Sequence, residues 1–451
     1  MSGRYKAYGE YKESGVEWVG SMPSHWTIEP LFSNCDAPIE KNSDGREKNV
    51  LSLSYGNIIP RDVDDNFGLL PESFNTYQLV YPQNIILRLT DLQNDKRSLR
   101  VGFSKQQGII TSAYLKLVFT KKMSSPFMYR LLHSYDTTKV FYGMGGGLRQ
   151  SMKFEDFRRL PLLIPSFAEQ TQIATFLDHE TAKIDTLIDK QQQLIELLKE
   201  KRQAVISHAV TKGLDPDVPM KDSGVEWLGE VPEHWKVLAI KKIVSTPITD
   251  GPHETPNFID EGISFISAEA ISSGVIDFSK QRACISIKDH IRFSEKYKPH
   301  LYDIYMVKSG ATTGVSAIVE TINDFNIWSP LAALRCSEIA FPYFVLYFLR
   351  SQQFLTAIEL NWSFGTQQNI GMGVIGNIYI SCPPIKEAMI ISDHIRQKCS
   401  KIESLITLAT HQISLMQERR TALISAAVTG KIDVRDWQVP VTQTESDEVM
   451  A

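Results

Sequence analysis

Residues 14–20, Ser-Gly-Val-Glu-Trp-Val-Gly, return at residues 223–229 as Ser-Gly-Val-Glu-Trp-Leu-Gly. The match continues to a proline, a histidine and a second tryptophan, so that ten of the fifteen positions from Lys12 to Trp26 are identical at an offset of 209 residues. Solenoid repeats have periods of about 20–50 residues, so a repeat of this length has the size of a domain. The chain therefore contains two similar halves, which suits a partner with approximate two-fold symmetry such as DNA.

A second repeat links the ends of the two halves. Pro165 begins a stretch that reappears from Pro383 at an offset of 218 residues, and both copies end in Ala-Val-Thr. Each stretch lacks glycine and proline for about forty residues, which predicts one long helix in each half. At 1.5 Å per residue, each helix is a rod of roughly 60 Å.

Apolar residues in both stretches recur at close to seven-residue spacing, as in a coiled coil with polar interruptions. Two helices of matched length and register in one chain most simply pack on each other, and the domain between them lets the second return antiparallel. Two amphipathic helices in separate domains are the alternative. The residues that we assign to this coiled-coil spacer are Leu177, Ile184, Leu198, Val205, Ile395, Ile402, Met416 and Leu423.

Between the tryptophan motif and each helix lies a segment rich in β-branched and aromatic residues and broken by Gly, Pro, Asn and Asp, which predicts a strand-rich globule. We expect one short helix near the end of each globule, at 126–142 and 342–360. The predicted fold class is α+β, with two similar mixed α/β recognition domains joined by two long antiparallel helices in pseudo-two-fold symmetry. The predicted segments are a frame segment (1–26), a first recognition domain (27–165), a first spacer helix (166–212), the repeated frame segment (213–235), a second recognition domain (236–383), a second spacer helix (384–430) and a C-terminal tail (431–451), the end of which we expect to be disordered.

The composition is that of an ordinary globular protein, with 43% hydrophobic and 22% charged residues. The five cysteines form no CxxC pair, so neither a disulfide framework nor a zinc ribbon is indicated. The N-terminus lacks the apolar core of a signal peptide, and the longest apolar run, 340–349, is too short for a membrane helix. We therefore expect a cytoplasmic protein that does not bind a membrane.

The net charge of −4 argues mildly against a nucleic-acid binder, but the distribution of charge matters more than its sum. Residues 81–160 carry fourteen Lys and Arg against five Asp and Glu, a net charge of +9. Residues 280–350 carry nine against six, a net charge of +3. The first half is clearly basic and the second only weakly so.

The sequence contains none of the common catalytic motifs. Residues 371–376 match GxGxxG, but a predicted strand follows them, whereas a dinucleotide loop must open a helix. No GxxxxGK[ST] loop, HExxH pair, GxSxG elbow or Asn/Asp-Pro-Pro-Tyr/Phe tetrapeptide is present. We therefore predict no catalytic residue, no metal site and no cofactor site in this chain.

Several polar loops carry the side chains that contact DNA. Arginine bonds guanine and glutamine bonds adenine in a bidentate manner, while lysines, hydroxyl groups and backbone exposed by glycine contact phosphates. For each residue, an ordinary exposed polar side chain is the alternative. The DNA-binding candidates are Lys96, Arg97, Arg100, Lys105, Arg149, Gln150, His253, Thr255, Lys308, Ser309, Thr312, Thr313, Gln367 and Gln368.

As a set, these features resemble the specificity (S) subunit of type I restriction–modification enzymes, over about residues 11–437. The resemblance rests on the twin Ser-Gly-Val-Glu-Trp motifs, the Asp-Gly-Pro-His turn at 250–253, the Ser-Gly-Ala-Thr-Thr-Gly loop at 309–314 and the similar ends of the two long helices. The first half lacks the Asp-Gly-Pro-His turn. The second helix opens with Glu387-Ala, where the first opens with Glu169-Gln.

The resemblance implies a non-catalytic subunit whose two target-recognition domains each read one part of a split sequence in double-stranded DNA. It implies that two methyltransferase (M) subunits dock on the helical frame, and it allows a restriction (R) subunit to join them. S-adenosylmethionine and Mg/ATP are then expected only in these partner subunits. The alternatives are a coiled-coil scaffold whose globules bind proteins and a stand-alone DNA-modifying enzyme.

Overall fold

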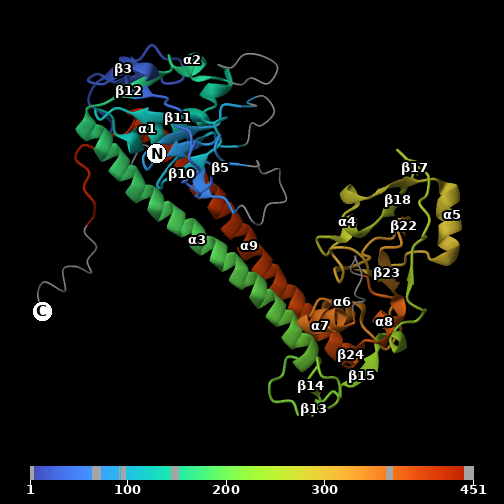
Figure 1. The fold of residues 1–451 in the computed structure, drawn as a ribbon. Coiled ribbons are helices and arrows are strands. Elements are labelled where there is room, and N and C mark those ends of the chain that lie inside the picture. Colours follow the sequence, from blue (N-terminus) through green and yellow to red (C-terminus); the bar gives the residue numbers. More distant parts are fainter. Residues whose placement is uncertain are drawn as a thin grey trace, which may run out of the picture. The chain divides into compact units, whose positions relative to one another are not determined.

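The computed structural model describes residues 5–62, 73–90, 92, 98–143, 152–361 and 369–440. The chain divides into two compact units, of which unit 1 comprises Met1–Gln191 with His411–Ala451 and unit 2 comprises Gln192–Thr410. The long helices α3 (Phe167–Lys212) and α9 (Ile385–Val428) each contribute to both units (Figure 1). Each compact unit therefore combines one recognition domain with one end of each long helix, a different division from the seven segments predicted from the sequence.

Unit 1 is built mainly from short strands. A six-stranded sheet in the order β4-β11-β8-β9-β6-β5 is accompanied by the pairs β10-β7, β12-β3 and β1-β2. Helix α1 packs against β9 of the large sheet. The elements are β1 (Tyr11–Glu13), β2 (Ser21–Pro23), β3 (Thr27–Pro30), β4 (Cys35–Asp36), β5 (Leu51–Ser54), β6 (Asn57–Pro60), β7 (Gln78–Val80), β8 (Ile85–Leu87), β9 (Val101–Phe103), β10 (Gly108–Ile110), β11 (Leu115–Phe119), α1 (Ser125–Thr137), α2 (Phe154–Phe157) and β12 (Pro161–Ile164).

Unit 2 has the same frame around a different interior. Two four-stranded sheets, β16-β23-β20-β21 and β17-β19-β18-β22, accompany the pairs β15-β24 and β13-β14. The elements are β13 (Met220–Asp222), β14 (Glu230–Pro232), β15 (Lys236–Ala239), β16 (Thr249–Asp250), β17 (Phe258–Ile259), β18 (Ile263–Ile266), α4 (Ala268–Ile271), β19 (Ala283–Ile285), α5 (Ile287–Lys296), β20 (Ile304–Val307), β21 (Ser316–Ile318), β22 (Phe325–Ile327), β23 (Leu331–Leu334), α6 (Pro342–Leu349), α7 (Gln352–Leu360), α8 (Met372–Asn377) and β24 (Tyr379–Cys382).

The frame repeats strand by strand, as the sequence repeat predicts. The hairpin β1–β2 corresponds to β13–β14, and the antiparallel pair β3–β12 corresponds to β15–β24. Thr27 pairs with Ile164 in unit 1, and the residues 209 and 218 positions later, Lys236 and Cys382, pair in unit 2. The two sequence offsets thus describe the two strands of one repeated ribbon.

The long helices pack on each other within each unit, and the packing is antiparallel. In unit 1 the first turns of α3, with Ile173 and Leu177, share a core with Leu423 and Val428 near the end of α9. In unit 2 the end of α3 shares a core with the beginning of α9. Of the predicted spacer residues, Val205 and Met416 are half-buried and the others are buried: Leu177, Ile184, Leu198, Ile395, Ile402 and Leu423.

The short helices differ in detail from the prediction. Helix α1 ends at Thr137, before the predicted end of 142. The predicted helix at 342–360 is two helices, because Ser351 starts a new one: its side-chain oxygen accepts a hydrogen bond from the backbone N–H of Phe354 at 3.3 Å. A serine at this position caps a helix N-terminus and so favours a break between α6 and α7.

Candidate nucleic-acid interface

A buried carboxylate joins the two polar loops that the sequence singled out in unit 2. The side chain of Asp250, at the end of β16, is 1% exposed and faces Lys296 Nζ at 2.5 Å, Lys308 Nζ at 3.3 Å and His253 Nε2 at 3.0 Å. Burial raises the pKa of Asp250, but the hydrogen bond and charge of Lys296, aided by the other two basic groups, outweigh it and hold the pKa below its ordinary value. Two lysines against one carboxylate leave positive charge at this end of the unit, and Lys296 was not among the predicted residues.

The turn that follows β16 packs so closely that only glycine fits at position 251. A Cβ atom there would lie 1.9 Å from the carbonyl oxygen of Ile327. Lys296 fixes the same turn by donating to the carbonyl oxygen of Gly251 at 2.8 Å. The turn is thereby held against the end of a strand, and it presents the exposed side chains of His253 and Thr255.

Two glycines in the left-handed region shape the second loop. Gly310 has a φ of 101° and Gly314 a φ of 94°, a conformation that glycine adopts without steric cost. The hydroxyl group of Thr313 donates to the carbonyl oxygen of Gly310 at 2.7 Å and closes the loop. Thr312 at the tip is exposed, so a hydroxyl group and nearby backbone face outward, as contact with a phosphate requires.

A cavity of about 440 Å³ opens beside this loop. Its walls combine Ser309 and Thr312, which the sequence predicted, with Glu269 and Lys280, which it did not. Lys280 lies at the edge of the weakly basic region, but no pattern in the sequence marked Glu269. The cavity brings them together because the segments that carry them lie at one end of the same domain.

Gln367 and Gln368 lie outside the described residues. Asn369, the next residue along the chain, forms an isolated antiparallel bridge with Ser309, and the backbone N–H of Ile370 donates to the carbonyl oxygen of Lys308 at 2.8 Å. The described chain therefore resumes directly beside the loop at 308–314.

Unit 1 brings fewer predicted residues together. Lys105 is exposed in the connection from β9 to β10. Arg100 has an exposed fraction of 0%, and its guanidinium group donates to the carbonyl oxygen of Thr90 at 2.8 Å. Arg100 is therefore a structural residue, and its prediction as a direct DNA contact is corrected. The remaining unit 1 candidates lie outside the described residues: Lys96, Arg97, Arg149 and Gln150.

Two buried titratable side chains on α1 lie inside unit 1. Burial lowers the pKa of His133 to about 4, assisted by the charges of Arg130 and Arg420. Burial raises the pKa of Asp136 to about 6, although its carboxylate accepts a hydrogen bond from the backbone N–H of Arg100. Their surroundings make them determinants of stability, since both belong to the packed face of the helix.

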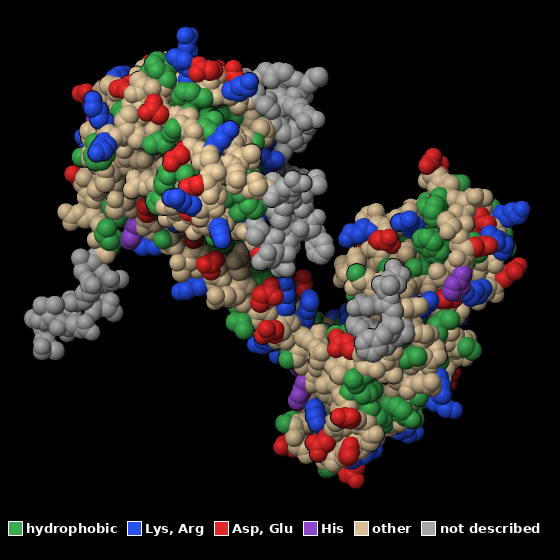
Figure 2. Space-filling view, in the orientation of Figure 1, with side chains coloured by type: hydrophobic (Ala, Val, Ile, Leu, Met, Phe, Trp, Pro, Cys, Tyr) green, Lys and Arg blue, Asp and Glu red, His purple; other side chains and the backbone are tan. Residues whose placement is uncertain are grey.

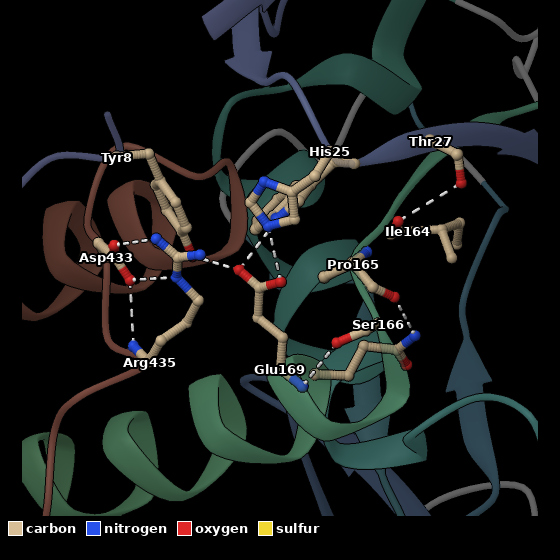
Figure 3. Close-up of polar contacts among 11 residues, drawn as sticks. Tyr8, His25, Thr27, Ile164, Pro165, Ser166, Glu169, Asp433 and Arg435 are labelled. Atoms are coloured by element: carbon tan, nitrogen blue, oxygen red, sulfur yellow. Dashed lines mark hydrogen bonds and ion pairs between the residues drawn. The ribbon is translucent and has the colours of Figure 1, made fainter. Parts of the chain in front are cut away.

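The repeated tryptophan motif fixes the first turn of a long helix (Figure 3). In unit 1 the carboxylate of Glu169 accepts hydrogen bonds from Trp26 Nε1 at 3.0 Å and from the Tyr8 hydroxyl group at 2.6 Å, and it lies 3.0 Å from His25 Nε2. Arg435, held by Asp433, lies over the ring of Tyr8 with its guanidinium carbon 5.1 Å from the ring centre. The residues at both ends of the described chain thus meet at the start of α3.

Unit 2 repeats this arrangement at the start of α9. Glu387, which is 218 residues after Glu169, accepts a hydrogen bond from Trp235 Nε1 at 3.0 Å and lies 2.8 Å from His234 Nε2. The glutamate is therefore the functional part of both helix openings, and the difference between Glu-Gln and Glu-Ala does not alter the contact. The conserved frame is a structural device that holds the helices in register with the domains.

The described residues contain no group of three or more His, Cys, Asp or Glu side chains that could hold a metal ion, and none of their helices is long and apolar enough to cross a membrane. On the face that Figure 2 shows, basic and acidic side chains are interspersed over both units. Positive charge is therefore local on this face, as it is around Asp250, instead of forming one continuous field.

Comparison with known proteins places these features in context. No family model matches the chain. The chain is 22% identical over 366 residues to the type I restriction enzyme MjaVIII specificity subunit of Methanocaldococcus jannaschii, which covers 80% of this chain and 81% of the relative. It is 24% identical over 379 residues to the type I restriction enzyme EcoBI specificity subunit of Escherichia coli, which covers 82% of this chain and 77% of the relative.

Solved structures share the fold over most of the chain. One is a chain from a structure on complex assembly and conformational transition of the type I R-M system, with a TM-score of 0.68, 14% identity and coverage of 91% of this chain and 99% of that chain. Another is the HsdS subunit from Thermoanaerobacter tengcongensis, with a TM-score of 0.51, 14% identity and coverage of 91% and 98%. The predicted α+β fold with two strand-rich domains and long helices is confirmed.

Proposed function

We propose that this chain, which belongs to the specificity subunits of type I restriction enzymes, reads a two-part target in double-stranded DNA with one recognition domain for each part. The chain itself is non-catalytic. Its role is to hold the two domains on a fixed frame and to bring partner subunits to the DNA.

The observation that carries this proposal is the repeated frame around two dissimilar interiors. Trp26 with Glu169 and Trp235 with Glu387 make the same contact at the same place in each unit. Between them, unit 1 contains a six-stranded sheet and unit 2 two four-stranded sheets. Equivalent frames place the domains in equivalent positions, whereas different interiors read different sequences.

Unit 2 shows how a domain reads DNA. The turn with His253 and the loop with Thr312 converge through Asp250 and Lys308, and they supply lysine, hydroxyl and backbone groups that suit phosphates. Half-sites that are read from one side of the duplex lie about one turn apart, roughly 34 Å. A pair of long helices is stiff enough to maintain such a distance.

The partners that we propose are two methyltransferase subunits and a restriction subunit. Exposed leucines recur on the long helices at the offset of 218: Leu187 is 51% exposed and corresponds to Leu405, which is 50% exposed, while Leu197 at 62% corresponds to Leu415 at 44%. Two equivalent apolar patches suit two copies of one partner. The methyltransferase would supply S-adenosylmethionine chemistry, and this chain would supply its position on the DNA.

Leu405→Glu tests the docking surface. We expect it to reduce co-purification of the methyltransferase from two copies per chain toward one, because a carboxylate would be buried in the contact. Thr407→Glu adds the same charge at a nearby exposed position of α9 and should leave the ratio unchanged. An unchanged ratio in Leu405→Glu would place the methyltransferase elsewhere.

The function is tested by expressing the chain with its partner methyltransferase and mapping methylated adenines across the host genome. We expect one motif made of two specific parts separated by an unspecified gap. Methylation without the chain, or S-adenosylmethionine binding by the isolated chain, would favour the enzyme alternative. DNA binding by the complex without a steep dependence on salt would favour the scaffold alternative, since phosphate contacts release counterions.

A further inference from the structure

Three strand ends gather charged and aromatic side chains at one end of the sheet β17-β19-β18-β22. Strands β18 and β22 are parallel, with Ile266 opposite Ile327, and β19 runs antiparallel to β18. Helix α4 with Glu269 follows β18, Arg282 directly precedes β19, and Trp328 directly follows β22. The topology therefore places these three side chains at the same end of the sheet.

Glu269 and Arg282 form an ion pair there. Arg282 Nη1 lies 3.5 Å from Glu269 Oε1, and the two side chains are 47% and 57% exposed. The guanidinium carbon of Arg282 lies 5.6 Å from the ring centre of Trp328, so the arginine is oriented by the indole as well as by the carboxylate. Its backbone N–H donates to the carbonyl oxygen of Phe265 at 3.0 Å, which fixes the base of the side chain.

An ion pair this exposed contributes little to stability, because water screens both charges. The pair nevertheless borders the cavity of about 440 Å³ that Glu269 shares with Ser309 and Thr312. The same end of the domain carries the turn at Gly251, which packs on the carbonyl oxygen of Ile327. The donor and acceptor of the pair thus face the surface on which the proposed phosphate contacts converge.

The chemistry of the pair matches the major-groove edge of a G·C base pair. Guanine presents O6 and N7 as two adjacent acceptors, which arginine bonds in a bidentate manner, and cytosine presents the N4 amino group as a donor to a carboxylate. In the base pair the N4 donor lies beside the O6 acceptor, so a carboxylate held beside a guanidinium group has the complementary order. An A·T pair offers thymine O4 next to a methyl group in place of the two guanine acceptors.

We propose that Glu269 and Arg282 together read one G·C base pair in the half-site of the second recognition domain. This inference rests on the proposed function, because it requires that the domain enters the major groove. Arg282 bonds guanine O6 and N7, Glu269 accepts from cytosine N4, and Trp328 orients the arginine.

The test uses the complex of this chain with its methyltransferase and measures binding and adenine methylation on duplexes that carry each of the four base pairs at every half-site position. For the wild-type complex, we expect one position of the second half-site to require G·C by roughly 10- to 100-fold. Arg282→Ala should remove that preference and leave all other positions unchanged. Glu269→Ala should relax the same position.

Arg282→Lys keeps the charge but loses the bidentate geometry, so it should relax this position even if the alanine variant folds poorly. Lys298→Ala, which breaks an ion pair with Asp324 in which both side chains are 51% exposed, is the matched control and should leave the motif unchanged. A uniform loss of binding on all duplexes would make Arg282 a phosphate contact and overturn the inference, as would relaxation at an A·T position or no relaxation at all. A wild-type complex without a two-part motif would instead overturn the proposed function.

Discussion

Asp185 on α3 and Arg420 on α9 form an ion pair within unit 1, with Oδ1 and Nε 2.8 Å apart. The residues 218 positions after Asp185 and before Arg420 are Glu403 and Arg202, and they form the equivalent pair within unit 2 at 3.0 Å. In both pairs the residue numbers sum to 605, since 185 + 420 and 202 + 403 are equal. One antiparallel register therefore relates the helices in both units, and the two-fold repetition extends to single side chains.

Reversal of one charge in the Asp185–Arg420 pair should destabilise unit 1 slightly. We expect Asp185→Arg to lower the free energy of unfolding by about 0.5–1 kcal/mol, because the pair is partly exposed. Adding Arg420→Asp should restore most of the loss, since the charges are again opposite. Urea unfolding of the full chain measures both, and a double variant no more stable than the single one would show that the pair does not set the register.

The glutamates of the frame should differ in their contribution to stability. Glu169→Ala leaves the buried Trp26 Nε1 and the Tyr8 hydroxyl group without their acceptor, which costs about 3 kcal/mol. Glu387→Ala should cost about 1 kcal/mol, because the Glu387 side chain is 33% exposed and water can replace the carboxylate. Urea unfolding gives the two values, and hydrogen exchange at the first turns of α3 and α9 locates the losses. Equal losses would contradict the role of burial.

Gly251→Ala should disable the second recognition domain while the first keeps its sequence. The new Cβ atom would meet the carbonyl oxygen of Ile327 at 1.9 Å, so the turn that carries His253 must move. We expect discrimination at the second half-site to fall at least tenfold, which corresponds to about 1.4 kcal/mol. Gly373→Ala is the control, because nothing lies within 4 Å of the added atom. Unaltered discrimination in Gly251→Ala would remove the turn from the interface.

Acid should weaken unit 1 through His133. The unfolded chain binds a proton on this histidine below about pH 6.5, whereas the buried side chain stays neutral until about pH 4. The unfolded state therefore binds more protons in this window, and the free energy of unfolding falls as the pH falls from about 6.5 to 4. Asp136 acts in the opposite direction, because its folded pKa of about 6 lies above the ordinary value.

His133→Asn should remove the histidine contribution to this acid sensitivity. We expect the variant to lose up to about 3 kcal/mol less than the wild type between pH 7 and pH 4. Urea unfolding at several pH values provides the measurement, with Asp136→Asn as the variant that shifts the slope the other way. Identical pH profiles for the wild type and His133→Asn would show that the histidine is accessible to protons in the folded state.

The frame was predictable because it repeats. The twin motifs around Trp26 and Trp235, and the helices that follow, are marked by identical residues at fixed offsets, and long stretches without glycine or proline have one dominant local structure. The boundaries of α6 and α7 were less predictable, because a single serine cap decides them.

The candidate site was predictable only in part, since burial and side-chain pairing depend on tertiary contacts. Arg100 has the composition of a DNA contact but lies inside unit 1. Glu269 and Arg282 are thirteen residues apart and meet only because α4 and β19 adjoin one end of a sheet. Lys296 reaches Asp250 from a different element for the same reason.

The central claim is that a rigid repeated frame sets the distance between two independently read half-sites. Four residues inserted after Gln191 in α3, together with four inserted after Ala409 in α9, would lengthen both helices by about 6 Å. Since one base pair adds about 3.4 Å, adenine methylation mapping of the co-expressed complex should show both half-site sequences unchanged and the gap longer by about one or two base pairs. An unchanged gap, or altered half-site sequences, would contradict the account.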